Sequence, residues 1–136
     1  MVGEKASSEG SKVYYLASGD KKWQQTPHIT AARIALDSKG HLWTVNSLGN
    51  VFRSQETGAK LLNSRLQAMP GKAQDIGTGG DGSIWVISTK RGVYRWNTAN
   101  NQWQRLSGIA IRIDVDPNGI PWVVNRKGNL YSGDFK

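Results

Sequence analysis

Acidic and amide side chains recur at turn positions along this chain, and their polar atoms can hydrogen-bond the hydroxyl groups of a ligand. The residues concerned are Asp37, Asp81, Asp116, Asn46 and Asn125. Aspartate accepts hydrogen bonds, and asparagine both donates and accepts them, which suits polyhydroxylated molecules such as sugars. The same side chains also stabilise tight turns by bonding to nearby backbone groups. Ligand contact and turn formation therefore both stay open for these residues.

The chain also has six tryptophans, which supply apolar surface. An amphipathic aromatic ring at a half-wet site offers a face on which a sugar ring can stack. Trp43, Trp85 and Trp122 stand at equivalent positions of a repeated pattern and are predicted to pack in the core. The other three lie on or near predicted outer strands, where we expect partial exposure and ligand contact: Trp23, Trp96 and Trp103.

Two basic pairs, Lys90-Arg91 and Arg126-Lys127, occupy matching positions of the repeats, so their charge is predicted to collect on one face. With a formal net charge of +8, such a face suits an anionic ligand, such as a phosphorylated glycan or a lipid headgroup. A solvated rim is the alternative reading. No recognised nucleic-acid-binding motif accompanies the charge, which argues against nucleic acid as a partner.

The residue groupings that catalysis or metal binding require are missing from the sequence. There is no cysteine, and the two histidines, His28 and His41, fall in different parts of the repeat. Residues 114–119 resemble the opening of a calcium-binding EF-hand loop, but the twelfth position holds Asn125 in place of glutamate. We therefore expect no enzymatic activity, no metal and no cofactor.

A short sequence motif, the repeated phrase, occurs three times and defines the structural elements that carry these residues. It covers residues 34–43, 76–85 and 113–122, with glycine six positions after the isoleucine and tryptophan three after the glycine. A hydrophobic–aromatic pair follows eight residues beyond each tryptophan, as in Val51-Phe52. A period of about forty residues is typical of propeller blades or solenoids.

Alternation and turn signals divide each repeat into short strands and predict an all-β fold with few helices. Glycines are expected to share two turn positions, the first held by Gly40, Gly82 and Gly119, the second by Gly49, Gly92 and Gly128. An outer fourth strand is predicted at residues 22–25, 60–64 and 102–106, with Leu61-Leu62 in place of Trp23 and Trp103. Four antiparallel strands per unit is the pattern of a β-propeller blade.

These elements predict the following organisation: a flexible tail at residues 1–12, strands within residues 13–25 that complete a blade, and repeats at about 28–66, 70–106 and 109–134. Three repeats fall short of the roughly four to eight blades that close a propeller. Open blade faces and strand edges invite association, so we expect a homodimer that forms a six-bladed ring. The alternative is that the chain is a piece of a longer propeller.

The central repeat also resembles a known family. Residues 69–76 (MPGKAQDI), 80–86 (GDGSIWV) and 92–95 (GVYR) are similar to a tectonin-type propeller repeat, and residues 102–131 and 23–52 resemble further copies. In the copy at residues 23–52, Pro27-His28 replaces the proline–glycine pair. The replacement of tryptophan by Leu61-Leu62 departs from the pattern.

The resemblance to tectonin/tachylectin-like lectins implies a six-bladed propeller and a non-catalytic, multivalent module that binds glycans, microbial or modified. Some intracellular members of the family act as adaptors or bind lipid, so a scaffold for a protein partner or for anionic lipid headgroups is the alternative. No stretch of eighteen apolar residues is present, and the N-terminus does not resemble a signal peptide. We expect a soluble, cytoplasmic protein, or an extracellular one if a signal was removed.

Overall fold

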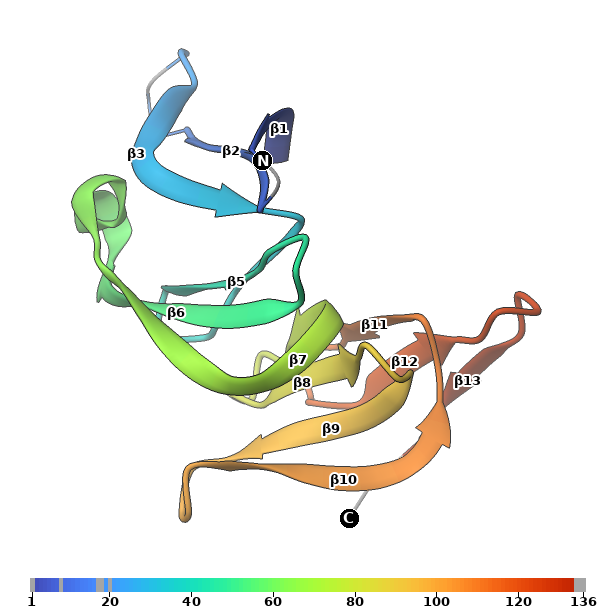
Figure 1. The fold of residues 1–136 in the computed structure, drawn as a ribbon. Coiled ribbons are helices and arrows are strands. Elements are labelled where there is room, and N and C mark those ends of the chain that lie inside the picture. Colours follow the sequence, from blue (N-terminus) through green and yellow to red (C-terminus); the bar gives the residue numbers. More distant parts are fainter. Residues whose placement is uncertain (1, 8, 17–18, 20, 134–136) are drawn as a thin grey trace.

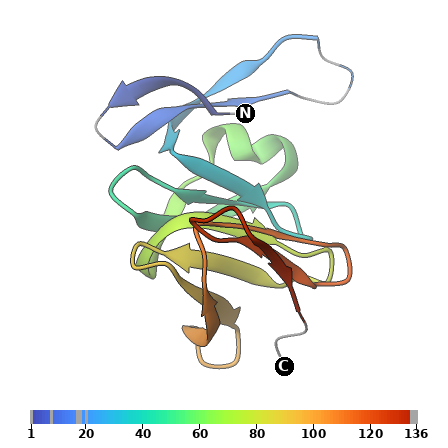
Figure 2. The same ribbon diagram turned by 90° about the vertical axis from the view of Figure 1, so that its right-hand side faces the viewer.

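A computed structural model of the chain describes all residues except 1, 8, 17, 18, 20 and 134–136. The described chain is built almost entirely from antiparallel strands, which confirms the all-β prediction. The sheets stack along a curved path from the N-terminal sheet to the C-terminal sheet (Figures 1 and 2). Among the described residues, a single helical segment, η1 (Gly58–Asn63), interrupts the strands.

The N-terminal sheet has three strands in the order β1-β2-β3. They span Val2–Ser7, Gly10–Tyr15 and Gln24–Ala31. We expected a flexible tail at residues 1–12, but the structure assigns most of that segment to β1 and β2. β1 pairs with β2 in an antiparallel ladder, so this sheet has one strand more than the sequence indicated.

The two central repeats form one seven-stranded sheet because they share the long strand β7. The first part of β7 pairs with β6, and its second part pairs with β8. We call the two four-stranded units blade A and blade B. Blade A contains β4 (Arg33–Leu36), β5 (His41–Val45), β6 (Asn50–Thr57) and the start of β7 (Leu66–Thr78). Blade B contains the end of β7, β8 (Ile84–Ser88), β9 (Gly92–Asn97) and β10 (Gln102–Ile109).

The third repeat forms blade C, a separate sheet of three strands in the order β11-β12-β13. These strands span Arg112–Val115, Pro121–Val124 and Leu130–Ser132. The prediction that this repeat contains three strands and lacks the fourth is confirmed for the described part of the chain.

The outer strand of blade A differs from the prediction. Residues 60–64 do not form a strand, because most of them belong to η1, where Leu61 is buried beside the N-terminal sheet. The outer strand begins at Leu66, which pairs with Ser54, whereas in blade B Trp103 pairs with Trp96. Leu66, rather than Leu61-Leu62, therefore takes the place of Trp103.

The first turn of each repeat confirms the predicted glycine position. Gly40, Gly82 and Gly119 have φ angles of +87°, +90° and +85°, a left-handed conformation that glycine adopts without steric cost. The second turn needs a correction. Gly49 and Gly128 have φ near +86° and +84°, but in blade B the corresponding residue is Arg91, with φ of +71°, and not Gly92.

The core lies between successive blades. Trp43 of blade A is buried against Ile76, Ile84 and Val86 of blade B. Trp85 of blade B is buried in the same way against blade C. Backbone hydrogen bonds repeat with the packing, since Ala73 N–H donates to Gly49 O at 2.8 Å and Ala110 N–H to Arg91 O at 2.9 Å. The prediction that Trp43 and Trp85 pack between blades is therefore confirmed.

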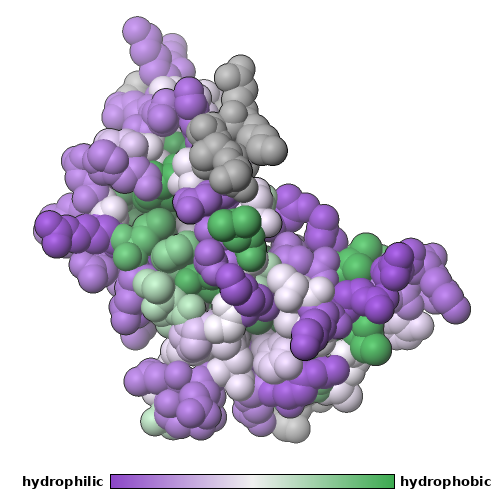
Figure 3. All heavy atoms as spheres, in the orientation of Figure 1, coloured by the Kyte–Doolittle hydropathy of each residue, from purple (hydrophilic) through white to green (hydrophobic). Residues whose placement is uncertain are grey.

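Trp122, which we expected in the core with them, is exposed instead. No further blade of the described chain stands beside blade C to cover it. Figure 3 shows hydrophobic side chains on the surface over blade C, at the right of the view, while hydrophilic side chains dominate most of this face. Blade C is therefore the end of the described stack.

Candidate binding grooves between the blades

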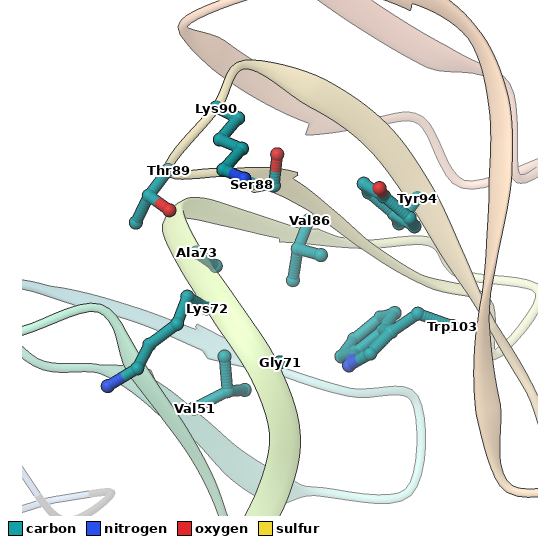
Figure 4. A pocket seen from close by; sticks show the side chains of 10 residues that line it. All are labelled: Val51, Gly71, Lys72, Ala73, Val86, Ser88, Thr89, Lys90, Tyr94 and Trp103. Carbon is teal, nitrogen blue, oxygen red and sulfur yellow. The ribbon is translucent and has the colours of Figure 1, made fainter.

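A groove of about 350 Å³ lies where blade A meets blade B. Two aromatic rings, Trp103 and Tyr94, stand together on one side of it, and the β8–β9 turn brings polar side chains to the other (Figure 4). The lining residues come from five strands and the β8–β9 turn: Val51, Gly71, Lys72, Ala73, Val86, Ser88, Thr89, Lys90, Tyr94 and Trp103. The groove thus combines an apolar wall with a polar rim.

The indole of Trp103 is held in a defined position. Its Nε1–H donates to Pro70 O at 2.7 Å, and its ring packs edge-on against Trp96 and Trp43, with centroids 4.9 and 6.3 Å away. Gly71 allows this close approach, since a Cβ there would lie 3.3 Å from the indole Cδ1 and φ is +84°. The ring is therefore preorganised, which lowers the entropy cost of stacking a ligand on it.

The charged side chains on the polar rim are all positive. Lys72 and Lys90 are exposed, and none of the described residues that line this groove is acidic. The Lys72 ammonium donates to Asn50 Oδ1, which directs it across the blade junction. Ser88 Oγ accepts the N–H of Gly92 at 3.0 Å, so the β8–β9 turn that carries Thr89 and Lys90 has a fixed shape.

The groove recurs between blades B and C, as two adjoining cavities of about 300 and 360 Å³ that share Ile109, Asn125 and Tyr131. By register, Tyr131 corresponds to Tyr94 and Asn125 to Ser88. The rim of this second groove is more basic than that of the first, because Arg91, Arg126 and Lys127 all line it. No residue of the described blade C corresponds to Trp103, because that blade has no fourth strand.

The structure brings half of the predicted site residues to these grooves. Trp103 and Lys90 line the groove between blades A and B, and Arg91, Asn125, Arg126 and Lys127 line the groove between blades B and C. The others lie outside them: Trp23, Asp37, Asn46, Asp81, Trp96 and Asp116. Trp96 nevertheless supports the first groove from behind, through its contact with Trp103.

The turn aspartates and asparagines direct their oxygens at the backbone. Asp37 Oδ1 accepts the N–H groups of Lys39 and His41, and Asp37 Oδ2 accepts the indole N–H of Trp43 at 3.0 Å. Asp116 Oδ1 closes the equivalent turn of blade C by accepting the N–H groups of Asn118 and Ile120.

Asn46 and Asn125 do the same at the second turn. Each Oδ1 accepts two backbone N–H groups, two and four residues further on. This is the turn role that we left open beside ligand contact.

Asp81 does not share the position of Asp37 and Asp116, which Gly79 holds in blade B. Asp81 Oδ1 instead accepts the hydroxyl and the N–H of Ser83. Burial by itself would raise the pKa of Asp81, but these bonds, with Arg95 nearby, hold that pKa below its ordinary value.

One charged cluster was missed by the sequence reasoning. Arg33, Asp75 and Arg112 each directly precede the isoleucine of the repeated phrase, so they occupy one register position on the innermost strands. Asp75 Oδ1 lies 3.6 Å from Arg33 Nε, and Asp75 Oδ2 accepts the N–H of Ile113 at 2.8 Å. Burial raises the pKa of Asp75 despite these partners. Aligning the three copies one residue further back would have shown the cluster.

Four-stranded antiparallel blades, packed face to face around recurring tryptophans, define the class of β-propeller proteins. The Tectonin domain model matches residues 31–134, and the chain therefore belongs to the tectonin family. This confirms the resemblance seen in the repeats.

Among solved structures, one described as "YCF48 bound to D1 peptide" is similar in fold, with a TM-score of 0.53 at 16% sequence identity. The match covers 91% of this chain and 43% of that one, so the chain spans less than half the length of that neighbour. No curated protein sequence matches the chain significantly. Within the described residues, no helix is both long and apolar enough to cross a membrane.

Proposed function

We propose that this protein is a carbohydrate-binding module without catalytic activity and that the groove between blades A and B is its principal sugar site. The observation that carries the proposal is the pair of rings, Trp103 and Tyr94, beside the hydroxyl and ammonium groups of Ser88, Thr89 and Lys90. Aromatic faces accept the C–H surface of a sugar ring, while polar groups at the rim hydrogen-bond its hydroxyls. The size of the groove suits one or two sugar units.

Recurrence of the groove supports multivalent binding. The cavity between blades B and C offers Tyr131 as a stacking surface and Asn125 on its rim, though without a second indole. We infer that this is a weaker site of the same kind. Two weak sites on one rigid body can bind a polymeric or surface-bound glycan much more tightly than either alone.

The second candidate function is a scaffold that binds anionic lipid headgroups or a protein partner. The basic rim formed by Arg91, Arg126 and Lys127 favours it, because clustered cations attract anionic surfaces. The structural neighbour is described as a complex with a peptide, which keeps a peptide ligand within this second candidate.

A glycan array followed by calorimetry with a selected glycan tests the first proposal. Trp103→Ala should weaken binding about tenfold, equivalent to about 1.4 kcal/mol, because a preorganised stacking surface is lost. Tyr131→Ala should leave the stronger site intact and lower the measured stoichiometry. Lys39→Ala is the matched control, since Lys39 is exposed at the β4–β5 turn and lies outside both grooves.

The same samples distinguish the second candidate. If no glycan on the array is bound while the protein binds vesicles of phosphatidylcholine with phosphatidylserine, and salt abolishes that binding, the lipid reading replaces the carbohydrate one. Retained glycan affinity in Trp103→Ala would show that the sugar binds elsewhere.

A further inference from the structure

The two ends of the blade stack carry complementary halves of the packing seen between blades. On blade C, Trp122 is 46% exposed and Leu130 is 67% exposed. Their register equivalents are buried in the other blades: Trp43 and Trp85 are each 2% exposed, and Val51 and Val93 are 1% and 0% exposed. The outer face of blade C is therefore an inter-blade face without its neighbour in the described chain.

The face that normally covers these positions can be read from blade B. Tyr94, Trp96 and Trp103 pack onto the core cluster that contains Trp43. Trp96 and Trp103 contact the Trp43 ring edge-on, with centroids 6.4 and 6.3 Å away. Beside the inner-strand residues Ile76, Ile84 and Val86, a covering face thus has an outer part: a tyrosine on the third strand of the blade and two large apolar residues at the far end of its third and fourth strands.

The N-terminal sheet presents the same set of positions. The pairing of Tyr14 with Gln25 in β2 and β3 matches that of Tyr94 with Arg105 in β9 and β10, so Leu16 corresponds to Trp96 and Trp23 to Trp103. Val13 is buried against blade A, and side chains alternate along a strand, so Tyr14 and Leu16 face away from blade A. Leu16 is 41% exposed and Trp23 is 50% exposed.

We propose that the N-terminal sheet of a second copy of this chain packs on the outer face of blade C, with Leu16 and Trp23 covering Trp122 and Leu130. The contact continues the interfaces already formed between blades A and B and between blades B and C. It is head-to-tail, because the two faces differ, and a head-to-tail contact leaves no open face only when the ring closes. Two copies close it by forming the same contact twice. The N-terminal sheet then packs as a neighbouring blade and does not add a strand to blade C.

Solution mass by light scattering, measured on the full chain from about 1 to 100 μM, tests the pairing. The wild-type chain should have twice the mass of one chain. Leu130→Glu and Trp23→Glu should each weaken association at least a hundredfold, because either one places a charge in an apolar contact. Leu48→Glu is the matched control, since Leu48 is a 55% exposed leucine at the β5–β6 turn of blade A. Circular dichroism establishes that each variant is folded.

Mixing the two variants tests the head-to-tail geometry. Leu130→Glu retains an intact N-terminal sheet and Trp23→Glu retains an intact blade C, so the mixture should recover one contact and form heterodimers that neither variant forms alone. A dimer that Trp23→Glu leaves unchanged would overturn the proposal in favour of two blade C faces meeting. A wild-type mass of one chain at 100 μM, or a mass above two chains, would also overturn it.

Discussion

At the scale of single residues, the polar side chains of the two hairpin turns are used mainly by the fold. Asp37, Asp116, Asn46 and Asn125 each direct an oxygen at two backbone N–H groups, which leaves fewer free lone pairs for a ligand. A ligand contact from Asn125, the one that lines a groove, would therefore come from its amide nitrogen or its remaining lone pair. Among the aromatic rings of the grooves, Tyr94 has the Arg105 guanidinium over its ring, 5.6 Å from the centroid.

Arg91 has a backbone conformation that is unfavourable for a residue with a side chain. It holds the left-handed position that Gly49 and Gly128 hold in the other repeats. For a residue with a side chain this conformation costs about 1–2 kcal/mol, and the greater freedom of glycine in the unfolded chain offsets part of the gain from replacing it. Arg91→Gly should therefore raise the free energy of unfolding by about 1 kcal/mol, as measured by urea denaturation followed by tryptophan fluorescence.

Arg91→Ala is the control for that measurement. It removes the same charge and the same long side chain but keeps the Cβ atom that makes the conformation costly. The alanine variant should gain no stability, and equal stability of the two variants would show that backbone strain is not the cause.

At the scale of elements, the turn aspartate of the first hairpin makes different hydrogen bonds in blade A and in blade C. In blade A, Asp37 supports both the turn and the buried Trp43, whose indole N–H it accepts. In blade C, Asp116 accepts the turn N–H groups of Asn118 and Ile120. The same aspartate position therefore contributes to the core in one blade and to the turn only in the other.

The two substitutions to alanine should differ for this reason. Asp37→Ala leaves a buried indole N–H without an acceptor and should lower the free energy of unfolding by about 2–3 kcal/mol, against about 1 kcal/mol for Asp116→Ala. Thermal and urea unfolding of both variants measure the difference. Losses of the same size would mean that the bond to Trp43 contributes nothing to stability.

At the scale of the whole molecule, Asp75 connects three blades near their innermost strands. It belongs to blade B, lies beside Arg33 of blade A and accepts the N–H of Ile113 in blade C. Because burial raises its pKa above the ordinary 3.8, the folded chain holds this proton to a higher pH than the unfolded chain does. The stability contributed by protonation is present below about pH 3.8 and is lost as the pH rises through the folded pKa.

Asp75→Asn removes this titration. The wild-type protein should lose stability relative to Asp75→Asn as the pH rises from 3 towards 7, as followed by urea denaturation at each pH. Asp81→Asn is the control of opposite sign: the pKa of Asp81 is lowered, so its contribution is present above the ordinary pKa and lost as the pH falls. If the wild type instead gains stability over Asp75→Asn with rising pH, the ion pair with Arg33 outweighs burial.

Much of the blade could be read from spacing alone, because a strand–turn–strand unit depends on residues close in the chain. The isoleucine, glycine and tryptophan of the repeated phrase predicted the inner strand, its turn and the second strand in all three copies. Prediction failed where the unit is irregular. The residues around Leu61 form a helical turn because Leu61 packs on the N-terminal sheet, a contact distant in sequence.

The second turn shows a different reason for error. The residue type suggested Gly92, but Gly49 and Gly128 each stand six residues after the tryptophan of their repeat, where blade B has Arg91. Arg91 accordingly holds the left-handed position. Whether a predicted binding residue lines a groove depends on which turn of the blade carries it. Those on the β8–β9 and β12–β13 turns line grooves, whereas Asp37 and Asp116, at the opposite turn of the blade, do not.

The sequence by itself determined most of the strand pattern, the glycines of the first turn, the family and the inter-blade positions of Trp43 and Trp85, because each depends on local geometry and on alternation along one strand. Only the tertiary structure decided which rings meet, since Trp43 comes from blade A, whereas Trp96 and Trp103 come from blade B. It also decided that Trp122 and Trp23 are exposed while their counterparts are buried or half-buried. Burial depends on what stands on a face, and that is a property of the stack of blades and not of any one repeat.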